Sequence, residues 1–475
     1  MFRFLTGLSC SHSISCFIDR ETNMTIIAIC GQLSHDLCEL EVRQGFMEEP
    51  CAHPNGQMRR AWWWSIGPAL ITACVVFGPG SLLVSANVGA THRFELLWLL
   101  VLTGILMGTY MSMAARIGVA GGATPCTLIA RHLNRTAAVV IGFNLFLICA
   151  TFQFGNNLAV AAAAGALIPG IAPEWIIVGL NVLIIVFLFG ARHIYRFLER
   201  TMKIMVGVIL VCFAANLAKA GPDIVEIARG FVPSLPEGVS LGVPKEVDGG
   251  VWDPMLLIAS LLGTTFSVGA AFFQGNLVRQ KGWGVQEYRK GIGDSIAGVA
   301  VLTAISGIIM ITTATVIPGK TATNIGMLAE SLKPLLGSMA YVMFCVGLLA
   351  VSMNPFLINA MIGGSILADG AGCPAGFNDK WPRCLTVLVL LIGMTVAILA
   401  LRTGQKPVKL IIVGQALTVL GNPLMAVAIL WLANQKAVMG SYRNKIAMNI
   451  LGGLGLLIVL FMAVRVLFLV VLKLT

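Results

Sequence analysis

Charged residues are scarce in this chain. Asp, Glu, Lys and Arg make up 11% of its 475 residues, whereas 57% of the residues are hydrophobic. A soluble domain of this size does not have enough interior to remove so much apolar surface from water. The composition therefore excludes a soluble globular protein and predicts an integral membrane protein, whose apolar side chains face lipid.

The charged residues that are present lie mostly in short polar connections between long apolar stretches. Because about 20 apolar residues cross a bilayer as a helix, each stretch predicts one transmembrane helix. The expected fold class is therefore all-α integral membrane, with a single transmembrane domain over residues 59–475. We count eleven stretches, at residues 62–90, 95–118, 136–168, 175–191, 202–219, 254–277, 291–317, 334–366, 383–401, 408–434 and 446–472.

Basic residues favour one side of the predicted membrane protein. Lys and Arg gather in the connections around residues 192–203 and 279–290. Since cytoplasmic loops carry an excess of Lys and Arg, this distribution predicts a cytoplasmic N-terminus and an external C-terminus. Topology thus explains the net charge of +11, and no nucleic-acid partner is needed. Without a cleavable targeting segment, a bacterial inner membrane is the expected location.

Ionisable side chains are missing from the middle of the apolar stretches. None of the 21 Asp and Glu residues lies there, and Glu95, Asp253 and Asp294 come closest, each near the end of a stretch. All six His residues lie in the first 58 residues or at loop positions. A charged group at the bilayer centre costs at least about 2.5 to 3.5 kcal/mol, so proteins keep one there for a function. Proton coupling, which needs a titratable group in the pathway, is therefore disfavoured.

Residues 1–58 differ from the rest of the chain. They are mixed polar and contain Cys10, Cys16, Cys30, Cys38 and Cys51 without a Cys-x-x-Cys spacing, so a zinc site or redox pair is not expected. Either this segment is a poorly ordered cytoplasmic extension, or translation begins later, at Met47 or Met58.

Two of the apolar stretches are interrupted. In VVFGPGSLLVSANVG, at residues 75–89, Gly78, Pro79 and Gly80 break the first stretch. Gly263, Ser267 and Gly269 break the sixth, which ends in Gln274 and Asn276. Such breaks free backbone groups that hydrocarbon cannot satisfy, so they persist only beside protein or water.

The two breaks hold corresponding places in two halves of five helices each. That pattern is typical of inverted-repeat transporters, whose half-helix ends meet at a substrate site near the bilayer midplane. We expect repeat 1 over about residues 61–219, repeat 2 over about 253–434 and a final helix over about 446–472. No nucleophile with its base, no phosphate loop and no metal-ligand cluster indicates an enzyme or a cofactor.

Four longer motifs extend over most of the chain: GPALITACVVFGPGSLLVSANVGA, GLLAVSMNPFLINAMIGGSILADG, WPRCLTVL and GQALTVLGNPLMAVAILWLANQKAVMG. In this order they resemble the first helix, the eighth helix, the start of the ninth helix and the tenth helix of the Nramp family of metal-ion transporters. The resemblance runs from about residue 60 to 450. It implies a LeuT-type fold of five plus five helices with an eleventh appended, and with helices 1 and 6 unwound at the midplane.

The departures from the family pattern fall at its functional positions. Family members that move manganese or iron carry an Asp and an Asn in the first break, where this chain has Gly78 and Ser81. In the sixth helix, a Met-Pro-His of the family is replaced by Ser267, Val268 and Gly269. Acidic residues of the third helix, which the resemblance links to proton movement, have become Phe152 and Gly155.

These replacements change the expected substrate. Ser, Gly and backbone carbonyls provide neither the anionic nor the soft ligands that a dehydrated transition-metal ion needs. A hard ion such as magnesium, which gives up its water reluctantly, could be held weakly with part of its hydration shell. We therefore expect a transporter of divalent metal ions, without proton coupling. Two alternatives stay open: a carrier of a small organic or neutral solute on the same scaffold, and a transport-inactive receptor.

The candidate binding residues lie at the breaks and on the tenth helix. Gln415 aligns with a family Gln that can turn toward the bound ion, although ordinary interhelical hydrogen bonding would also explain it. The expected partners are a divalent cation or a small solute as the substrate, and membrane lipid. We expect the protein to be a monomer or a weak oligomer. The substrate-binding candidates are Gly78, Pro79, Gly80, Ser81, Thr264, Ser267, Gly269 and Gln415; the candidates for lining the pathway are Asn87, Gln274 and Asn276.

Overall fold

The computed structural model describes residues 77–474, apart from 169, 190–191, 237–238, 240–241, 243, 248–249 and 320–323. The predicted extension at 1–58 and the first part of the first stretch lie outside these residues. The described elements are α3 (Pro79–His92), α4 (Leu97–Ala120), α5 (Pro125–His132), α6 (Arg135–Leu167), α7 (Pro173–Phe189), α8 (Arg192–Ala220), α9 (Ile224–Gly230), β1 (Lys245–Val247), β2 (Gly250–Trp252), α10 (Leu256–Thr265), α11 (Val268–Gln280), α12 (Val285–Val316), α13 (Ile325–Ala329), η1 (Glu330–Leu332), α14 (Lys333–Leu336), η2 (Gly337–Met339), α15 (Ala340–Ala371), α16 (Lys380–Leu401), α17 (Pro407–Leu417), η3 (Thr418–Gly421), α18 (Asn422–Asn434), α19 (Lys436–Met439), η4 (Gly440–Tyr442) and α20 (Ile446–Leu474).

The helices agree with the predicted all-α membrane class. Within the described residues, eight helical segments are long and apolar enough to cross a membrane, and 173–189 and 207–220 form shorter apolar helices. The segment 256–280 combines α10 and α11, and the segment 407–434 combines α17 and α18. Of the stretch predicted at 62–90, the structure describes only the second part, as α3.

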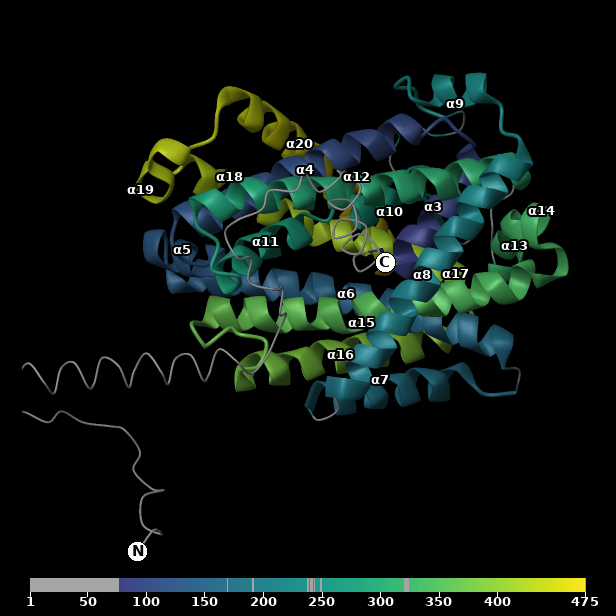
Figure 1. Ribbon diagram of the computed structural model, residues 1–475, viewed down its shortest axis with the longest axis horizontal. Coiled ribbons are helices and arrows are strands. Elements are labelled where there is room, and N and C mark those ends of the chain that lie inside the picture. Colours follow the sequence, from purple (N-terminus) through teal and green to yellow (C-terminus); the bar gives the residue numbers. More distant parts are fainter. Residues whose placement is uncertain are drawn as a thin grey trace, which may run out of the picture. The chain divides into compact units, whose positions relative to one another are not determined.

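Long helices pack side by side through small residues. α6 and α15 run together, with α16 and then α7 beside them (Figure 1). A Cβ atom on Gly142 of α6 would come within 2.9 Å of the Ile366 carbonyl oxygen, and one on Gly370 of α15 would come within 2.6 Å of the Ala138 carbonyl oxygen. Glycine is therefore required where these two backbones approach, as is usual for helices packed in a membrane.

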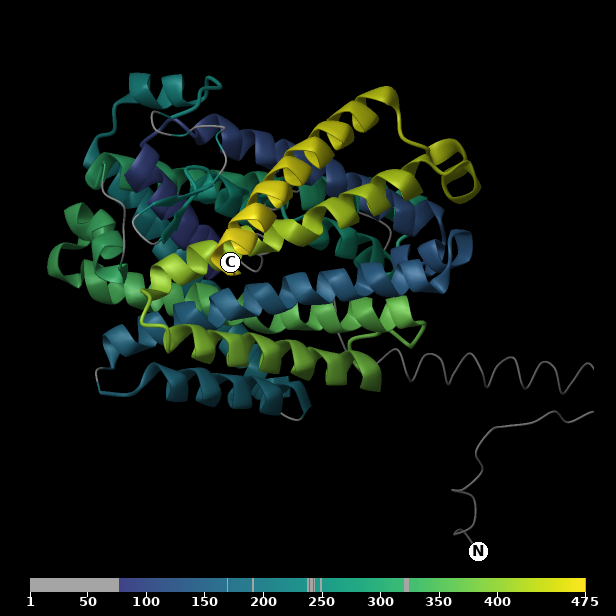
Figure 2. The same ribbon diagram turned by 180° about the vertical axis from the view of Figure 1, so that it is seen from behind.

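The last helix, α20, is tied to the rest of the domain by two buried polar contacts. It crosses α18 in the reverse view (Figure 2). The Tyr110 hydroxyl of α4 donates to the Gly452 carbonyl at 2.7 Å. Arg465 pairs with Asp253, just before α10, at 2.6 Å, and both side chains are buried. The sequence placed Asp253 near the end of a stretch but gave no partner for it.

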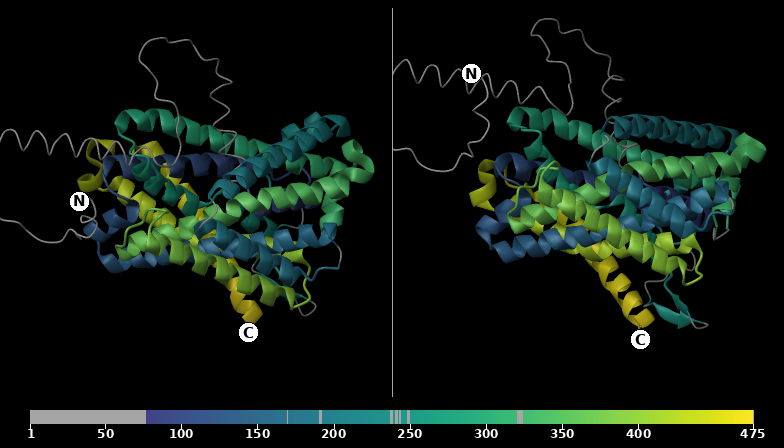
Figure 3. Two further views of the ribbon diagram at one scale, coloured as in Figure 1. Left: turned by 60° about the horizontal axis from the view of Figure 1, so that its bottom comes forward. Right: turned by 90° about the horizontal axis from the view of Figure 1, so that it is seen from below.

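The connection between α8 and α10 contains regular structure of its own. α9 is capped by Asp223, whose carboxylate accepts from the amides of Val225 and Glu226. β1 and β2 form an antiparallel hairpin in which Glu246 is paired with Val251. Figure 3 shows this hairpin near the end of α20.

Candidate substrate site

The sixth apolar stretch is interrupted at Phe266 and Ser267. α10 ends at Thr265 and α11 begins at Val268, with φ −106° and ψ 61° at Phe266 and φ −78° and ψ 89° at Ser267. Neither residue has helical dihedral angles. The break is shorter than the predicted one. Of the three residues expected to form it, only Ser267 lies in the break, whereas Gly263 lies inside α10 and Gly269 inside α11.

In the first predicted break, α3 begins immediately after Gly78. Gly78 is the extended N-cap of α3 and Pro79 occupies its first turn, where the missing amide of proline costs no hydrogen bond. No side chain caps this end. Gly80 and Ser81 therefore lie in the first turn of α3, whose amides are not satisfied within the helix.

Gln415 of α17 brings these two regions together. Its side chain is 1% exposed. A Cβ on Gly80 would lie 2.4 Å from its amide carbon, and a Cβ on Gly155 of α6 would lie 2.8 Å from its Nε2 atom. On the α10 side, a Cβ on Gly263 would lie 2.2 Å from the Gln415 carbonyl oxygen. The missing side chains at Gly80 and Gly155 thus leave room for the amide of Gln415, and the missing side chain at Gly263 lets the backbones of α10 and α17 approach each other.

The oxygen atoms near the amide of Gln415 favour a positively charged ligand on the side that faces α10. The Gln415 Oε1 atom is buried and has no hydrogen-bond partner among the described residues. The nearby end of α10 is its C-terminus, where unpaired carbonyls carry a partial negative charge. Two carbonyls here accept long bonds from side chains instead of helix amides: Gly263 O accepts from the Thr418 hydroxyl at 3.4 Å, and Phe266 O accepts from Asn422 Nδ2 at 3.4 Å. The atoms that could bind a ligand near Gln415 are therefore uncharged oxygen atoms.

The other predicted site residues lie in varied surroundings. Gly78 faces Pro355 of α15, and Gly269 packs against Leu145 and Ile148 of α6. The Thr264 hydroxyl donates to the Leu261 carbonyl of its own helix at 3.0 Å, so it is already satisfied. Ser267 is partly exposed and makes no capping bond to α11.

The predicted pathway residues do not gather at Gln415. Asn87 is fully buried in α3. Gln274 Nε2 donates to the Ser295 hydroxyl of α12 at 3.2 Å, and Asn276 Nδ2 donates to Asp369 at 3.0 Å. These two bonds between elements are the kind of contact that the sequence left open as the alternative to a lining role.

A buried carboxylate near the end of α15 was not identified from the sequence. Asp369 is 5% exposed. It accepts from the hydroxyls of Thr124 and Thr127 at 2.8 and 3.1 Å and from Asn276 at 3.0 Å. The predicted stretch stops at residue 366, whereas α15 continues to Ala371 and carries Asp369 into the protein. This carboxylate joins α5, α11 and α15.

Replacing Asp369 by Asn is expected to lower the free energy of unfolding by about 1 to 3 kcal/mol, because an amide cannot accept all three bonds and would turn a donor toward Asn276. Thermal unfolding of the detergent-solubilised protein measures this loss. Asp379→Asn, which removes one carboxylate that accepts from the Gly376 amide, is the control and should change little. Equal melting of Asp369→Asn and wild type would contradict the expectation.

Potential metal ligands do not cluster in the described part of the chain. No group of three or more His, Cys, Asp or Glu side chains is placed to hold an ion there. The buried amides of α6 are also committed: Asn156 donates to Gln153 at 2.7 Å, and Asn181 of α7 donates to Asn157 at 2.6 Å. Any ion at Gln415 would therefore meet neutral oxygen atoms.

Comparison with known proteins decides the family. The sequence matches the family described as natural resistance-associated macrophage protein-like over residues 69–469. The chain belongs to the Nramp family. This confirms the resemblance inferred from the motifs of the first, eighth, ninth and tenth helices.

Relatives and solved structures cover most of this Nramp protein. The divalent metal cation transporter MntH of Deinococcus radiodurans is 24% identical over 420 residues, which are 87% of this chain and 91% of that protein. MntH of Acidiphilium cryptum is also 24% identical, over 410 residues, 84% of this chain and 90% of that protein. The crystal structure of the Eremococcus coleocola manganese transporter, in complex with an aromatic bis-isothiourea substituted compound, superimposes with a TM-score of 0.66 at 18% identity, covering 87% of this chain and 88% of that one. The predicted Nramp fold is thus confirmed, and the chain is a multi-pass membrane transporter.

Proposed function

We propose that this Nramp protein transports divalent metal ions, favouring hard, partly hydrated ions such as magnesium over manganese or iron. The observation that carries the proposal is the buried Oε1 of Gln415, which has no hydrogen-bond partner among the described residues and belongs to an amide that faces Gly80 and Gly155. Nramp relatives named as divalent metal cation or manganese transporters support the substrate class. The neutral oxygen donors around Gln415 support the choice of a hard ion, because softer ions are selected by thiolate and thioether ligands.

The same site argues against proton coupling. Gly155 and Phe152 occupy positions where the family resemblance places acidic residues, and a proton pathway needs a titratable group. The proposed transport is therefore not coupled to protons; it runs down the gradient of the transported ion or is coupled to a different ion. Because Gln415 is closed off from solvent in this conformation, each half of the cycle must open one side of the site, as alternating access requires. We place the protein in a bacterial inner membrane with its N-terminus inside, on the distribution of Lys and Arg.

A carrier of a small neutral solute is the second candidate, and the uncharged surroundings of Gln415 are what favour it. Proteoliposomes loaded with a metal-sensitive dye separate the two. Magnesium, calcium and manganese are each offered, with and without a pH gradient. We expect magnesium flux that is independent of the pH gradient. Flux of none of the three ions would favour the solute carrier, and flux that follows the pH gradient would refute uncoupled transport.

Restoring a carboxylate at the start of α3 tests the position of the site. In Ser81→Asp, manganese affinity is expected to rise at least tenfold, about 1.4 kcal/mol, because an anionic ligand would join the oxygens near Gln415. Isothermal titration calorimetry on the purified protein measures this gain. Ser85→Asp, one turn further along α3, serves as the matched control. Equal manganese affinity in Ser81→Asp and Ser85→Asp would show that the start of α3 does not face the ion.

A further inference from the structure

An apolar groove of about 700 Å³ runs between α4 and α12. It is lined by one stripe of each helix, including Gly104 and Gly108 of α4 and Ala300 and Gly307 of α12. Gly108 and Gly307 leave space that larger side chains would fill, whereas Gly104 lets α4 and α12 approach, since its Cβ would lie 2.6 Å from Thr303 Oγ1. Its volume is within the range of pockets that enclose whole ligands, roughly 300–1,000 Å³.

The middle of the groove is apolar although it contains hydroxyl groups. The Thr109 hydroxyl donates to the Ile105 carbonyl at 2.8 Å, and the Thr303 hydroxyl donates to the Val299 carbonyl at 2.9 Å. Both hydroxyls are thereby satisfied by their own helices, and no polar group in the groove calls for water. Since α4 and α12 are both membrane-spanning by length and composition, the material that meets this groove is hydrocarbon.

The length of the groove suits a single acyl chain. Its α4 residues run from Leu97 to Ser112, a span of about 22 Å at 1.5 Å per residue. One leaflet contributes about half of the 30 Å hydrocarbon core, or roughly 15 Å. A chain lying in the groove could therefore be enclosed over the whole depth of its leaflet.

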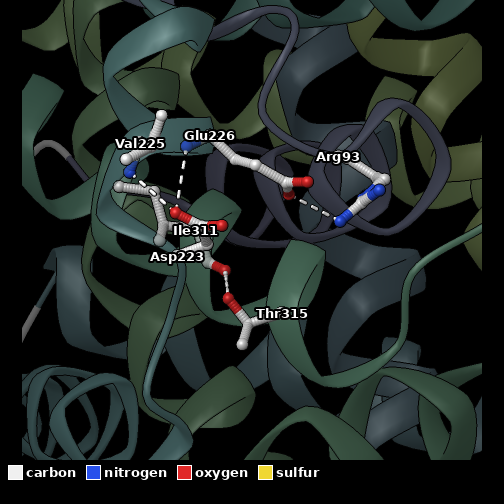
Figure 4. A network of polar contacts seen from close by, with 6 residues as sticks. All are labelled: Arg93, Asp223, Val225, Glu226, Ile311 and Thr315. Atoms are coloured by element: carbon white, nitrogen blue, oxygen red, sulfur yellow. Dashed lines mark hydrogen bonds and ion pairs between the residues drawn. The ribbon is translucent and has the colours of Figure 1, made fainter.

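The two ends of the groove differ in charge. At the end near Leu97 and Ile311, the guanidinium of Arg93 is paired with the Glu226 carboxylate of α9 at 2.7 Å, so its charge is neutralised (Figure 4). Phe231, directly after α9, lines this end of the groove. Arg229 of α9 is also exposed at this end, but the acidic Glu95 and Asp223 lie on the same connections. Among the described residues, this end therefore has no excess of positive charge for a phosphate.

The opposite end is polar and basic. The Ser112 hydroxyl lies 3.3 Å from that of Tyr288, and Arg116, one turn beyond Ser112, donates to Asn444 at 2.6 Å. Met448 of α20 lines the groove here, and the exposed Arg443 and Lys445 lie just before that helix. Their side chains have no carboxylate partner within the part of the chain that the structure describes. Lys and Arg at such a membrane boundary attract anionic lipid headgroups, by about fivefold in affinity for each residue.

We propose that the groove between α4 and α12 binds one acyl chain of an anionic phospholipid, with its headgroup at Arg443 and Lys445. The bound acyl chain would contact α4 and α12, which pack against α11 and α3. α12 meets Gly89 of α3, whose Cβ would lie 2.1 Å from the Met310 carbonyl oxygen, and α4 meets α11, where a Cβ on Gly118 would lie 2.5 Å from the Gly275 carbonyl oxygen. The lipid site is thus connected to α3 and α11 by backbone contacts.

Photolabelling of the full chain in detergent tests the groove. Phosphatidylglycerol with a photoactivatable diazirine in one acyl chain is added, and labelled peptides are located by mass spectrometry. Labels are expected to concentrate in residues 97–112 and 296–311. Gly108→Phe should reduce them at least fivefold, because a Cβ there has open space, its nearest atom being Ile296 Cγ1 at 4.0 Å, and the ring would fill the groove without disturbing the backbone.

Gly179→Phe on α7 is the matched control, since a Cβ there meets nothing within 4 Å and the site is remote from the groove in sequence and helix. It should leave the labels on α4 and α12 unchanged. Should Gly108→Phe elute as an aggregate, Gly307→Leu replaces it, because a Cβ there meets only Leu100 at an ordinary 3.7 Å. Labels spread evenly over all lipid-facing helices, and unaffected by either groove variant, would overturn the proposal.

The headgroup is tested with a second lipid. Diazirine-labelled phosphatidylcholine should label the groove less than phosphatidylglycerol does, and the double substitution Arg443→Gln and Lys445→Gln should remove most of that difference. Equal labelling by the two lipids in the wild-type protein would overturn the assignment of an anionic headgroup. All of these readouts are independent of transport, so they stand or fall separately from the proposed substrate.

Discussion

Replacing Asp253 by Ala is expected to lower the free energy of unfolding by about 3 to 5 kcal/mol. The Asp253 carboxylate lies 2.6 Å from Arg465, and the two side chains are 1% and 7% exposed. Removal of the carboxylate leaves the guanidinium buried in a low-dielectric interior without its counter-charge, and that is more costly than the loss of the bond itself. Since Arg465 belongs to α20 and Asp253 precedes α10, we expect α20 to detach from the rest of the domain before the other helices unfold.

Thermal unfolding in detergent measures the loss, and a double substitution identifies its cause. Asp253→Leu with Arg465→Met replaces both charges by apolar groups and should recover most of the stability, because no buried charge is left unpaired. The exposed pair of Arg93 and Glu226 supplies the control: Glu226→Ala should cost no more than about 1 kcal/mol. If Asp253→Ala and Glu226→Ala proved equally mild, the buried pair would not hold α20 in place.

The ion pair also shows where sequence reasoning reaches its limit. Arg465 and Asp253 are 212 positions apart, and only packing of α20 against α10 brings them together. Asp253 was noticed because charged residues are rare in this chain, but rarity does not reveal a partner. Asp369 escapes sequence reasoning for a related reason: the apolar stretch ends at residue 366, whereas hydrogen bonds from Thr124, Thr127 and Asn276 allow the helix to continue with a buried carboxylate.

The membrane class, the helices and the family followed from features that are local in sequence. Apolar length predicts a spanning helix without reference to its neighbours, and the Gly-Pro-Gly at residues 78–80 marks the start of α3 because proline suits a first turn. The neighbours of Gln415 could not be obtained in this way. Gly155 and Gly263 are two of 52 glycines, and a missing side chain has significance only once the atom that occupies its place is known.

Substituting Gly80 by Ala is expected to reduce metal flux at least tenfold. Its added Cβ would lie 2.4 Å from both the amide carbon and Nε2 of Gln415, and real Cβ atoms do not approach so closely. Because the atoms in conflict belong to the far end of a flexible side chain, Gln415 can turn away and the protein can still fold. The proposed ligand would then be displaced while the helices around it remain. Dye-loaded proteoliposomes report the flux, and thermal unfolding reports the fold.

A double-mutant cycle distinguishes this explanation from a general effect on α3. If Gly80→Ala acts by moving Gln415, then Gly80→Ala combined with Gln415→Ala should transport no worse than Gln415→Ala alone, so the two effects are not additive. Gly165→Ala on α6 is the control, because its Cβ meets nothing within 4 Å, and its flux should equal that of the wild type. Additive losses in the double variant would mean that Gly80 serves transport independently of Gln415. The amide would then be a packing group between helices, and the ion would have to be sought elsewhere along α3.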